Sequence, residues 1–224
     1  MLSLKPVQIS KIAVLAALYV ALSFIPVSMF IGAGSFLSLS LIITPVIAVL
    51  LQPFEALVCS CISGFIVVML NPGSAMFGIF TVLLPIAGAV CGSLSVHTKK
   101  GSLLTLVFLG ATVLYYIYSR GSFIFWIMPH VLALLLLIGI PFLEKRRLKT
   151  ITSTFISTMC EQGAMLLLAI NVLQLPVIVF QVAFPLMLYE RTFATIGGIL
   201  IILALKRVEP NLIVDIDNNV VVGL

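Results

Sequence analysis

The chain has 224 residues, of which 62% are hydrophobic and only 8% are charged. This composition excludes a soluble globular protein and indicates an all-α polytopic membrane protein with little mass outside the bilayer. The formal net charge of +5 comes from lysines and arginines scattered at the ends of apolar stretches, so it does not indicate a protein that binds nucleic acid.

The first predicted membrane helix covers Ile12–Met29, a stretch without any charged residue that is long enough to cross most of a bilayer. Within it, Ala13, Ala17 and Ala21 recur at every fourth position, and residues four apart lie on one face of a helix. We call these three residues the alanine ridge. Because helices in lipid associate through close approach over small side chains, the ridge either packs inside its own bundle or docks another membrane subunit.

Seven further apolar stretches follow, and their continuous hydrophobicity predicts helices and not the alternating strands of a membrane barrel. Their approximate bounds are Phe36–Leu51, Ala56–Leu70, Met76–Val96, Ser102–Tyr118, Phe123–Leu143, Thr150–Ile170 and Val177–Leu205. Pro185 is expected to divide the last stretch, so that its helix proper covers about Phe184–Leu205. The sequence therefore predicts one membrane domain of eight spans over residues 1–207 and a short cytoplasmic tail over 208–224.

Positive charge, which concentrates in cytoplasmic loops, tests this eight-span topology. With both termini in the cytoplasm, Arg120 alone lies outside and Arg191 lies within the membrane. The other ten of the twelve basic residues fall on the cytoplasmic side: Lys5, Lys11, Lys99, Lys100, Lys145, Arg146, Arg147, Lys149, Lys206 and Arg207. This asymmetry predicts that both termini are cytoplasmic.

Several motifs stand in a characteristic order along the chain. They are Ile12-Ala13-x-x-Ala16-Ala17-Leu18, Pro26, Gly32 with Gly34, Pro45, Pro53-Phe54-Glu55-Ala56 to Gly64, Pro85 to Gly92, and Tyr189 to Leu200 before Lys206-Arg207. In this order they resemble the substrate-binding S component of energy-coupling factor (ECF) vitamin transporters. The resemblance covers residues 10–100 and 150–207 and implies a core of six helices. The extra transmembrane hairpin at about 102–143 is then an insertion, which keeps the topology intact because it adds two spans.

The resemblance implies a high-affinity binding subunit for a small water-soluble vitamin or related micronutrient in the plasma membrane of a prokaryote. It implies three partners: a transmembrane coupling subunit, contacted by the alanine ridge, and a pair of ATPase subunits. A pocket open to the outside would have as its polar lining Glu161, Gln162, Tyr189, Glu190 and Arg191. Its apolar lid would consist of Phe30 and Phe36. The start Met1-Leu2-Ser3 lacks the histidine of cobalt- or nickel-specific members, which argues against a metal substrate.

Glu161, Glu190 and Arg191 are also notable without any resemblance, because ionisable side chains at membrane depth are costly and commonly functional. The simpler alternative is a structural cluster that neutralises itself and pins two helices together. Adjacent helical residues point about 100° apart, so either Arg191 pairs with Glu161 and Glu190 faces a cavity, or the reverse. An arginine would suit a carboxylate or phosphate ligand, whereas a free glutamate would suit a cationic or amide-rich one. The sequence leaves both open.

The chain carries no motif for nucleotide hydrolysis, zinc-dependent proteolysis or a serine nucleophile, so we predict no enzyme, no cofactor and no metal site. His97 and His130 stand alone. Trp126 is interpreted as an anchor at the membrane interface, with a stacking platform as the alternative. Two other functions remain open. One is a stand-alone proton-coupled secondary transporter using Glu161 or Glu190, which no clear internal repeat supports, and the other is a membrane scaffold without a ligand.

Overall fold

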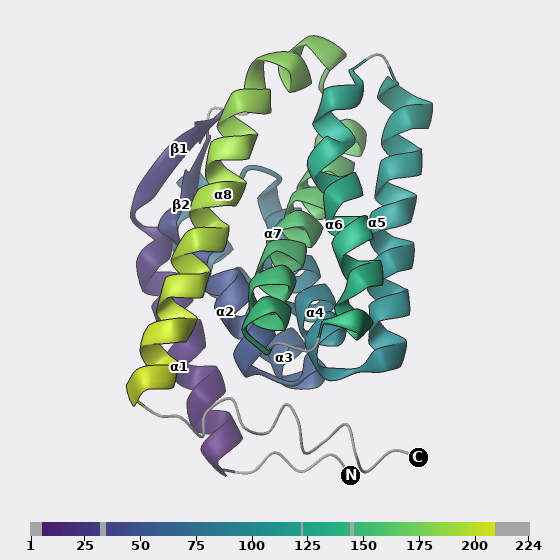
Figure 1. Ribbon diagram of the computed structural model, residues 1–224. Helices are drawn as coiled ribbons and strands as arrows, with labels where there is room; N and C mark the ends of the chain where they lie inside the picture. Colours follow the sequence, from purple (N-terminus) through teal and green to yellow (C-terminus); the bar gives the residue numbers. More distant parts are fainter. Residues whose placement is uncertain (1–5, 32–34, 122, 144–145, 209–224) are drawn as a thin grey trace.

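The computed structural model describes residues 6–31, 35–121, 123–143 and 146–208, which form a bundle of antiparallel helices with one small sheet (Figure 1). The α-helices are α1 (Pro6–Ser23), α2 (Ile43–Leu50), α3 (Pro53–Leu70), α4 (Leu83–His97), α5 (Lys99–Arg120), α6 (Met128–Gly139), α7 (Arg146–Asn171) and α8 (Val177–Val208). The strands are β1 (Pro26–Phe30) and β2 (Ser35–Ser38). Short 3-10 segments complete the fold: η1 (Leu39–Ile42), η2 (Pro72–Ser74), η3 (Gly78–Val82), η4 (Ile124–Ile127) and η5 (Ile140–Phe142).

Six helices among the described residues are long and apolar enough to cross a membrane. They are Pro6–Ser23, Pro53–Leu70, Gly78–His97, Lys100–Arg120, Arg147–Asn171 and Val177–Val208. Two further apolar helical segments, Leu39–Leu50 and Ile124–Gly139, are shorter than the ~20 residues that a straight spanning helix needs. Each of the eight predicted spans therefore contains a helix. The protein is a helical, multi-pass membrane protein by the length and composition of its helices, and the count of eight full spans stays a prediction.

The first helix is shorter than predicted and is followed by a β-hairpin. Helix α1 ends at Ser23 and not at Met29. Pro26 accounts for this end, because proline lacks a backbone N–H and disfavours a helical conformation in the residue before it. The chain from Pro26 instead forms β1, which pairs antiparallel with β2 and sets Met29 opposite Phe36. The predicted all-α fold is thus interrupted by this β-hairpin, consisting of β1 and β2.

The last helix is longer than predicted. Pro185 lies inside α8, which continues unbroken from Val177 to Val208. The predicted division at Pro185 was therefore wrong. Proline is tolerated inside helices of membrane bundles, because neighbouring groups can satisfy the backbone carbonyl that it leaves without a partner.

Helix α7 is the central helix of the bundle. In its most apolar 18-residue window 83% of the residues are buried, against 28–44% in the other five long helices. It packs most extensively against α4, where glycines permit close approach. A Cβ atom added at Gly88 would lie 2.6 Å from Thr44 Cγ2 and 2.9 Å from Glu161 Cβ, and one added at Gly92 would lie 2.6 Å from Ser157 Cβ. The Ser157 hydroxyl also donates a hydrogen bond to the Gly88 carbonyl oxygen at 2.8 Å. The glycines therefore fix where Glu161 stands relative to α2 and α4.

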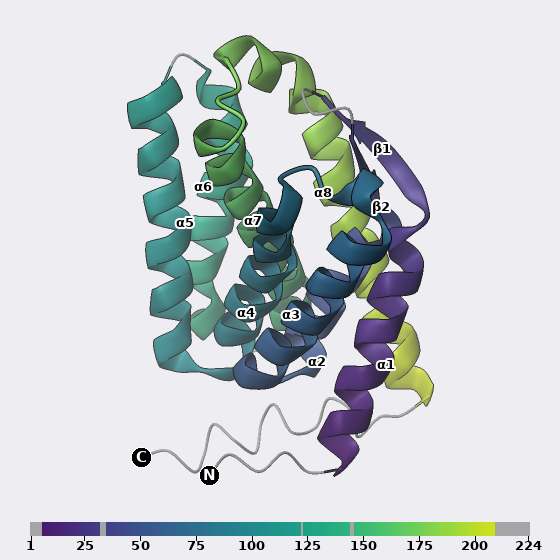
Figure 2. The ribbon, with the colours of Figure 1, turned by 180° about the vertical axis from the view of Figure 1, so that it is seen from behind.

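The two ends of the bundle differ in charge. The start of α1, the end of α8 and the starts of α5 and α7 lie at one end, which we call the basic end (Figure 1, Figure 2). Its described basic residues are Lys11, Lys99, Lys100, Arg146, Arg147, Lys149, Lys206 and Arg207. Arg120, in the last turn of α5, lies at the opposite end. This distribution has the asymmetry that the positive-inside rule describes. The side of the membrane that the basic end faces stays a prediction.

Helices α5 and α6 form the extra hairpin that was predicted at about 102–143. They lie side by side at one edge of the bundle (Figure 1). Helix α5 packs against α4 and α7, and α6 packs against α5 and α7. The Thr105 hydroxyl donates a hydrogen bond to the Cys91 carbonyl oxygen at 2.9 Å, which joins α5 to α4. The hairpin thus covers one side of α7.

Candidate functional site

A buried polar cluster lies where the middle of α7 faces the middle of α8. It consists of Glu161, Gln162, Glu190 and Arg191, each at most 3% exposed. Arg191 Nη1 lies 3.9 Å from Glu161 Oε2 and donates a hydrogen bond to the Thr158 carbonyl oxygen at 3.3 Å. The structure therefore brings together four of the residues predicted to line a pocket, and it selects the alternative in which Arg191 pairs with Glu161.

The pair of Arg191 and Glu161 is incompletely hydrogen-bonded. At 3.9 Å the two side chains form an ion pair without a direct hydrogen bond. In the described part of the chain, Arg191 Nε, Arg191 Nη2 and Glu161 Oε2 have no hydrogen-bond partner. Buried ion pairs stabilise a fold only when good geometry and further hydrogen bonds offset the loss of hydration. The cluster consequently holds unused hydrogen-bonding capacity at the centre of the bundle.

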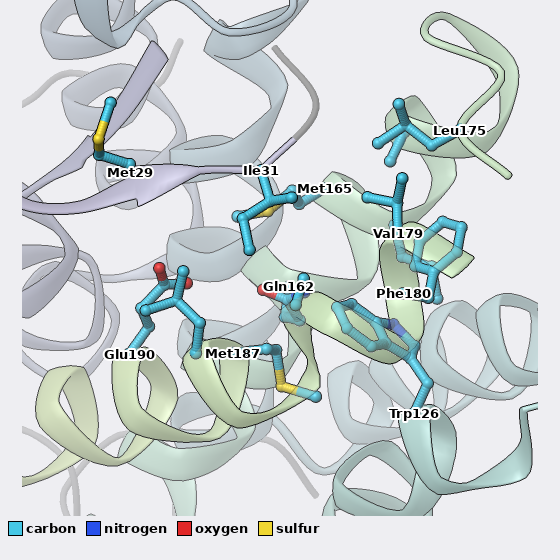
Figure 3. A pocket seen from close by; sticks show the side chains of 14 residues that line it. Met29, Ile31, Trp126, Gln162, Met165, Leu175, Val179, Phe180, Met187 and Glu190 are labelled. Carbon is cyan, nitrogen blue, oxygen red and sulfur yellow. The ribbon is translucent and has the colours of Figure 1, made fainter. Parts of the chain in front are cut away.

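Glu190 turns away from this pair and lines an apolar pocket with an empty volume of about 440 Å³, which we call the Glu190 pocket. The Ser28 hydroxyl on β1 donates a hydrogen bond to Glu190 Oε1. The pocket walls come from α7, α8, η4, the loop before α8 and the β-hairpin with its turn (Figure 3). They consist of Met29, Ile31, Trp126, Gln162, Met165, Leu166, Ala169, Leu175, Val179, Phe180, Ala183, Leu186, Met187 and Glu190. Small-molecule sites commonly have such a lining, mostly apolar with few polar groups.

The polar groups of the Glu190 pocket are spread along it. Glu190 lies at one end, Trp126 and Phe180 lie at the other, and Gln162 lies between them (Figure 3). The rings of Trp126 and Phe180 make a T-shaped contact with centroids 5.1 Å apart. Gln162 Oε1 and Trp126 Nε1 are buried and have no hydrogen-bond partner within the described residues. Because a buried polar group without a partner costs free energy, both groups favour a ligand that supplies one.

Glu161 lines a second pocket, separate from the first, with an empty volume of about 340 Å³. Phe36 of β2 belongs to the same lining. The hydroxyl groups of this pocket come from Tyr19, Ser38, Ser40, Ser74 and Thr81. The two carboxylates therefore face different cavities. The predicted lining residues are therefore divided between the two pockets, because Glu161 and Gln162 are adjacent on α7 and point about 100° apart.

Of the other predicted lining residues, Tyr189 lies outside both pockets. Tyr189 is 53% exposed, and its ring stacks on Phe193 with centroids 6.0 Å apart. Since successive helical residues turn by about 100°, the burial of Glu190 and Arg191 directs Tyr189 to the outer face of α8. Phe30 belongs to β1, but its side chain lies outside the described part of the structure. Among the described side chains, Phe36 of the predicted lid borders the second pocket, and the role of Phe30 stays a prediction.

The alanine ridge lies on the outer surface of the bundle. Ala13, Ala17 and Ala21 are exposed, and together with Ile62 and Ile66 of α3 they line an apolar groove between α1 and α3. We call it the alanine groove. The buried residues of α1 are Ile12, Leu15, Ala16, Tyr19 and Ser23. The interpretation that the ridge packs inside its own bundle was therefore wrong for all three alanines.

Sequence reasoning gave no pocket role to Trp126 and Phe180, which line the Glu190 pocket, or to Ser28, which is bonded to Glu190. Ser28 fell inside the predicted first helix, although Pro26 could have indicated that the helix ends before it. Trp126 was interpreted as an interface anchor, but it is 5% exposed and lies in the pocket wall, which favours the stacking alternative. Phe180 had no distinguishing signal in a stretch of apolar residues.

Among the described residues, no three histidine, cysteine, aspartate or glutamate side chains lie together so as to hold a metal ion. In comparisons with known proteins, no family model, no curated protein and no solved structure matches the chain. The resemblance to ECF S components thus remains an expectation from the order of motifs.

Proposed function

We propose that the chain is a membrane-embedded binding subunit for the uptake of a small water-soluble vitamin or related micronutrient. The observation that carries the proposal is the Glu190 pocket, in which a mostly apolar wall surrounds a buried carboxylate and a buried amide. This combination is typical of sites that hold small molecules. A carboxylate inside a membrane protein is costly to keep, so a function for Glu190 is the expected reason for its presence.

The proposal places the energy source in other subunits. The chain has no nucleotide-binding motif, and the S components that it resembles depend on a transmembrane coupling subunit and a pair of ATPase subunits. The alanine groove supports such a partner, because exposed small side chains allow the backbone of another helix to approach closely in lipid. By the same resemblance, the protein is assigned to the plasma membrane of a prokaryote.

In the proposed mechanism, the ligand enters from the end opposite the basic end and passes the β-hairpin. It pairs with the carboxylate of Glu190, whose Oε1 still accepts the hydrogen bond of the Ser28 hydroxyl. Binding and the position of the β-hairpin are therefore linked through one hydrogen bond. The coupling subunit, seated in the alanine groove, reorients the loaded protein, and the ligand leaves on the cytoplasmic side.

The first test is mass spectrometry of small molecules that the full chain retains after purification in mild detergent. We expect one compound at about one equivalent, and at least about tenfold less of it on the Glu190→Gln variant, because a charge-assisted hydrogen bond is lost. Tyr189→Phe is the matched control, since the neighbouring side chain faces outward and should leave retention unchanged. The proposal would be contradicted if Glu190→Gln retained as much of the compound as Tyr189→Phe. It would also be contradicted if the wild-type chain retained no compound at all.

A second test addresses the partner. Ala17→Trp fills the alanine groove with an indole ring and should abolish uptake by cells while the purified protein still binds its ligand. Leu114→Trp is the control, because Leu114 is 69% exposed on α5, outside that groove. If both variants take up ligand like the wild type, the docking role of the alanine ridge is refuted. Uptake driven by a pH gradient with this chain alone in liposomes would replace the proposal with a proton-coupled transporter.

A further inference from the structure

The acidic and basic residues at the centre of the bundle are not equal in number. Two acids, Glu161 and Glu190, accompany a single base, Arg191, and all three are at most 3% exposed. Arg191 Nη1 pairs with Glu161 and donates a hydrogen bond to the Thr158 carbonyl oxygen, and Arg191 does not line the Glu190 pocket. Among the described residues, no basic side chain lies within ion-pair distance of Glu190.

The hydroxyl of Ser28 does not correct this imbalance. It donates one hydrogen bond to Glu190 Oε1 and carries no charge, so the second carboxylate oxygen and the charge itself remain available to a ligand. Arg120, at the opposite end from the basic loops, donates hydrogen bonds to the carbonyl oxygens of Leu175 and Ser119 and does not line the pocket. His130 is fully buried in α6 and does not line the pocket either.

The remaining walls suit an organic molecule and not an inorganic ion. Calcium and magnesium require about six or more oxygen ligands, whereas the described lining of this pocket offers side-chain oxygens from Glu190 and Gln162 only. At the far end, the rings of Trp126 and Phe180 present aromatic surface, which packs against flat apolar groups and also attracts cations. Met165 and Met187 add soft, polarisable surface between the two ends.

We infer that the ligand of the Glu190 pocket is an organic monocation with a flat apolar body. Its positively charged nitrogen pairs with Glu190, its body packs against Trp126 and Phe180, and a hydrogen-bond donor along it meets Gln162 Oε1. Ligands recognised through a carboxylate or phosphate are excluded, because the arginine that would bind them lies outside the pocket and Glu190 would repel them. This inference rests on the proposed function only in taking the pocket as the binding site of a small nutrient.

The chain contains a single tryptophan, and that residue is Trp126 in the pocket wall. Tryptophan fluorescence of the purified full chain in detergent therefore reports directly on occupation of the Glu190 pocket. Three probes share a phenyl group and a short chain and differ in charge: phenethylamine is cationic, phenethyl alcohol is neutral and hydrocinnamate is anionic. Isothermal titration calorimetry provides a second readout that does not depend on Trp126.

We expect phenethylamine to bind about ten- to hundredfold more tightly than phenethyl alcohol, and hydrocinnamate to bind most weakly. In Glu190→Gln the preference for the amine over the alcohol should fall to about twofold or less, whereas Tyr189→Phe should keep the wild-type ranking. Equal binding of amine and alcohol, tightest binding of the anion, or no response to any probe would overturn the inference. The wild-type ranking decides the matter even if Glu190→Gln does not fold.

The two proposals fail in distinguishable ways. A neutral or anionic nutrient found on the purified protein would leave the binding function standing and refute the cationic ligand. Selective binding of phenethylamine by a protein that supports no uptake in cells would leave the cation site standing and refute the transport function.

Discussion

The glycine at position 88 decides whether Glu161 can reach its place beside Arg191, so we predict that Gly88→Ala destabilises the protein. The added Cβ would lie 2.6 Å from Thr44 Cγ2, 2.9 Å from Glu161 Cβ and 3.1 Å from the Ser157 carbonyl oxygen. Carbon atoms in contact normally stay ~3.5–4.0 Å apart, so α2 and α7 must each move by roughly half an ångström to one ångström. Overpacking of this kind costs about 1–3 kcal/mol in the free energy of unfolding.

The assay is thermal unfolding in detergent, compared with Gly110→Ala. Gly110 also lies inside a helix, α5, but a Cβ there would meet nothing within 4 Å. Alanine is the better helix former by about 1 kcal/mol, so Gly110→Ala should leave the melting temperature unchanged or raise it. Gly88→Ala should lower it and should also weaken ligand binding, because Glu161 and Gln162 move together with α7.

The reasoning would be refuted if Gly88→Ala melted at the same temperature as Gly110→Ala and bound ligand like the wild type. That result would mean that α4 and α7 separate at little cost and that the position of Glu161 does not depend on the glycine. Loss of stability with unchanged binding would restrict the role of Gly88 to packing.

Two further predictions concern the polar cluster. Arg191→Met should lower the free energy of unfolding by about 3–5 kcal/mol, because it leaves Glu161 as an unpaired buried charge, and the double variant with Glu161→Leu should recover most of the loss in thermal unfolding. A double variant as unstable as the single one would show that Arg191 serves a partner other than Glu161. Ser28→Ala should speed ligand release about two- to tenfold in stopped-flow fluorescence, since one hydrogen bond no longer holds the β-hairpin to Glu190. An unchanged release rate would separate the hairpin from ligand exchange.

The helices could be predicted from the sequence because long apolar stretches and the charges between them are strong local signals. The β-hairpin could not, since the residues from Pro26 to Phe30 continue the apolar character of α1, and a short apolar run does not distinguish strand from helix. Pro185 misled for the opposite reason. It is a strong breaker of helices in water, but proline is tolerated inside helices of membrane bundles, and α8 continues through it.

The cluster of ionisable residues could be predicted, but the side chain that faces the pocket could not, because that depends on how α8 is rotated about its axis. Gly198 fixes the rotation: a Cβ there would lie 2.8 Å from Pro45 Cγ and 3.2 Å from Thr154 Cγ2, so this face of α8 packs tightly against α2 and α7. Arg191 precedes Gly198 by two helical turns and therefore lies on the same inward face. Glu190 is then offset by about 100° toward the pocket, and Tyr189 points outward.

The alanine groove and the Glu190 pocket lie at different heights of the bundle, but helix α1 connects them by a short path. The ridge occupies its outer face, and the helix ends at Ser23, whose carbonyl oxygen accepts a hydrogen bond from Asn71 Nδ2 at 2.7 Å. Strand β1 begins at Pro26 and carries Ser28, which is bonded to Glu190. A partner that shifted α1 would therefore act on the pocket without touching it. Ala17→Trp, which fills the alanine groove, should therefore remove the effect of the coupling subunit on the rate of ligand release. The affinity of the isolated chain for its ligand should stay the same.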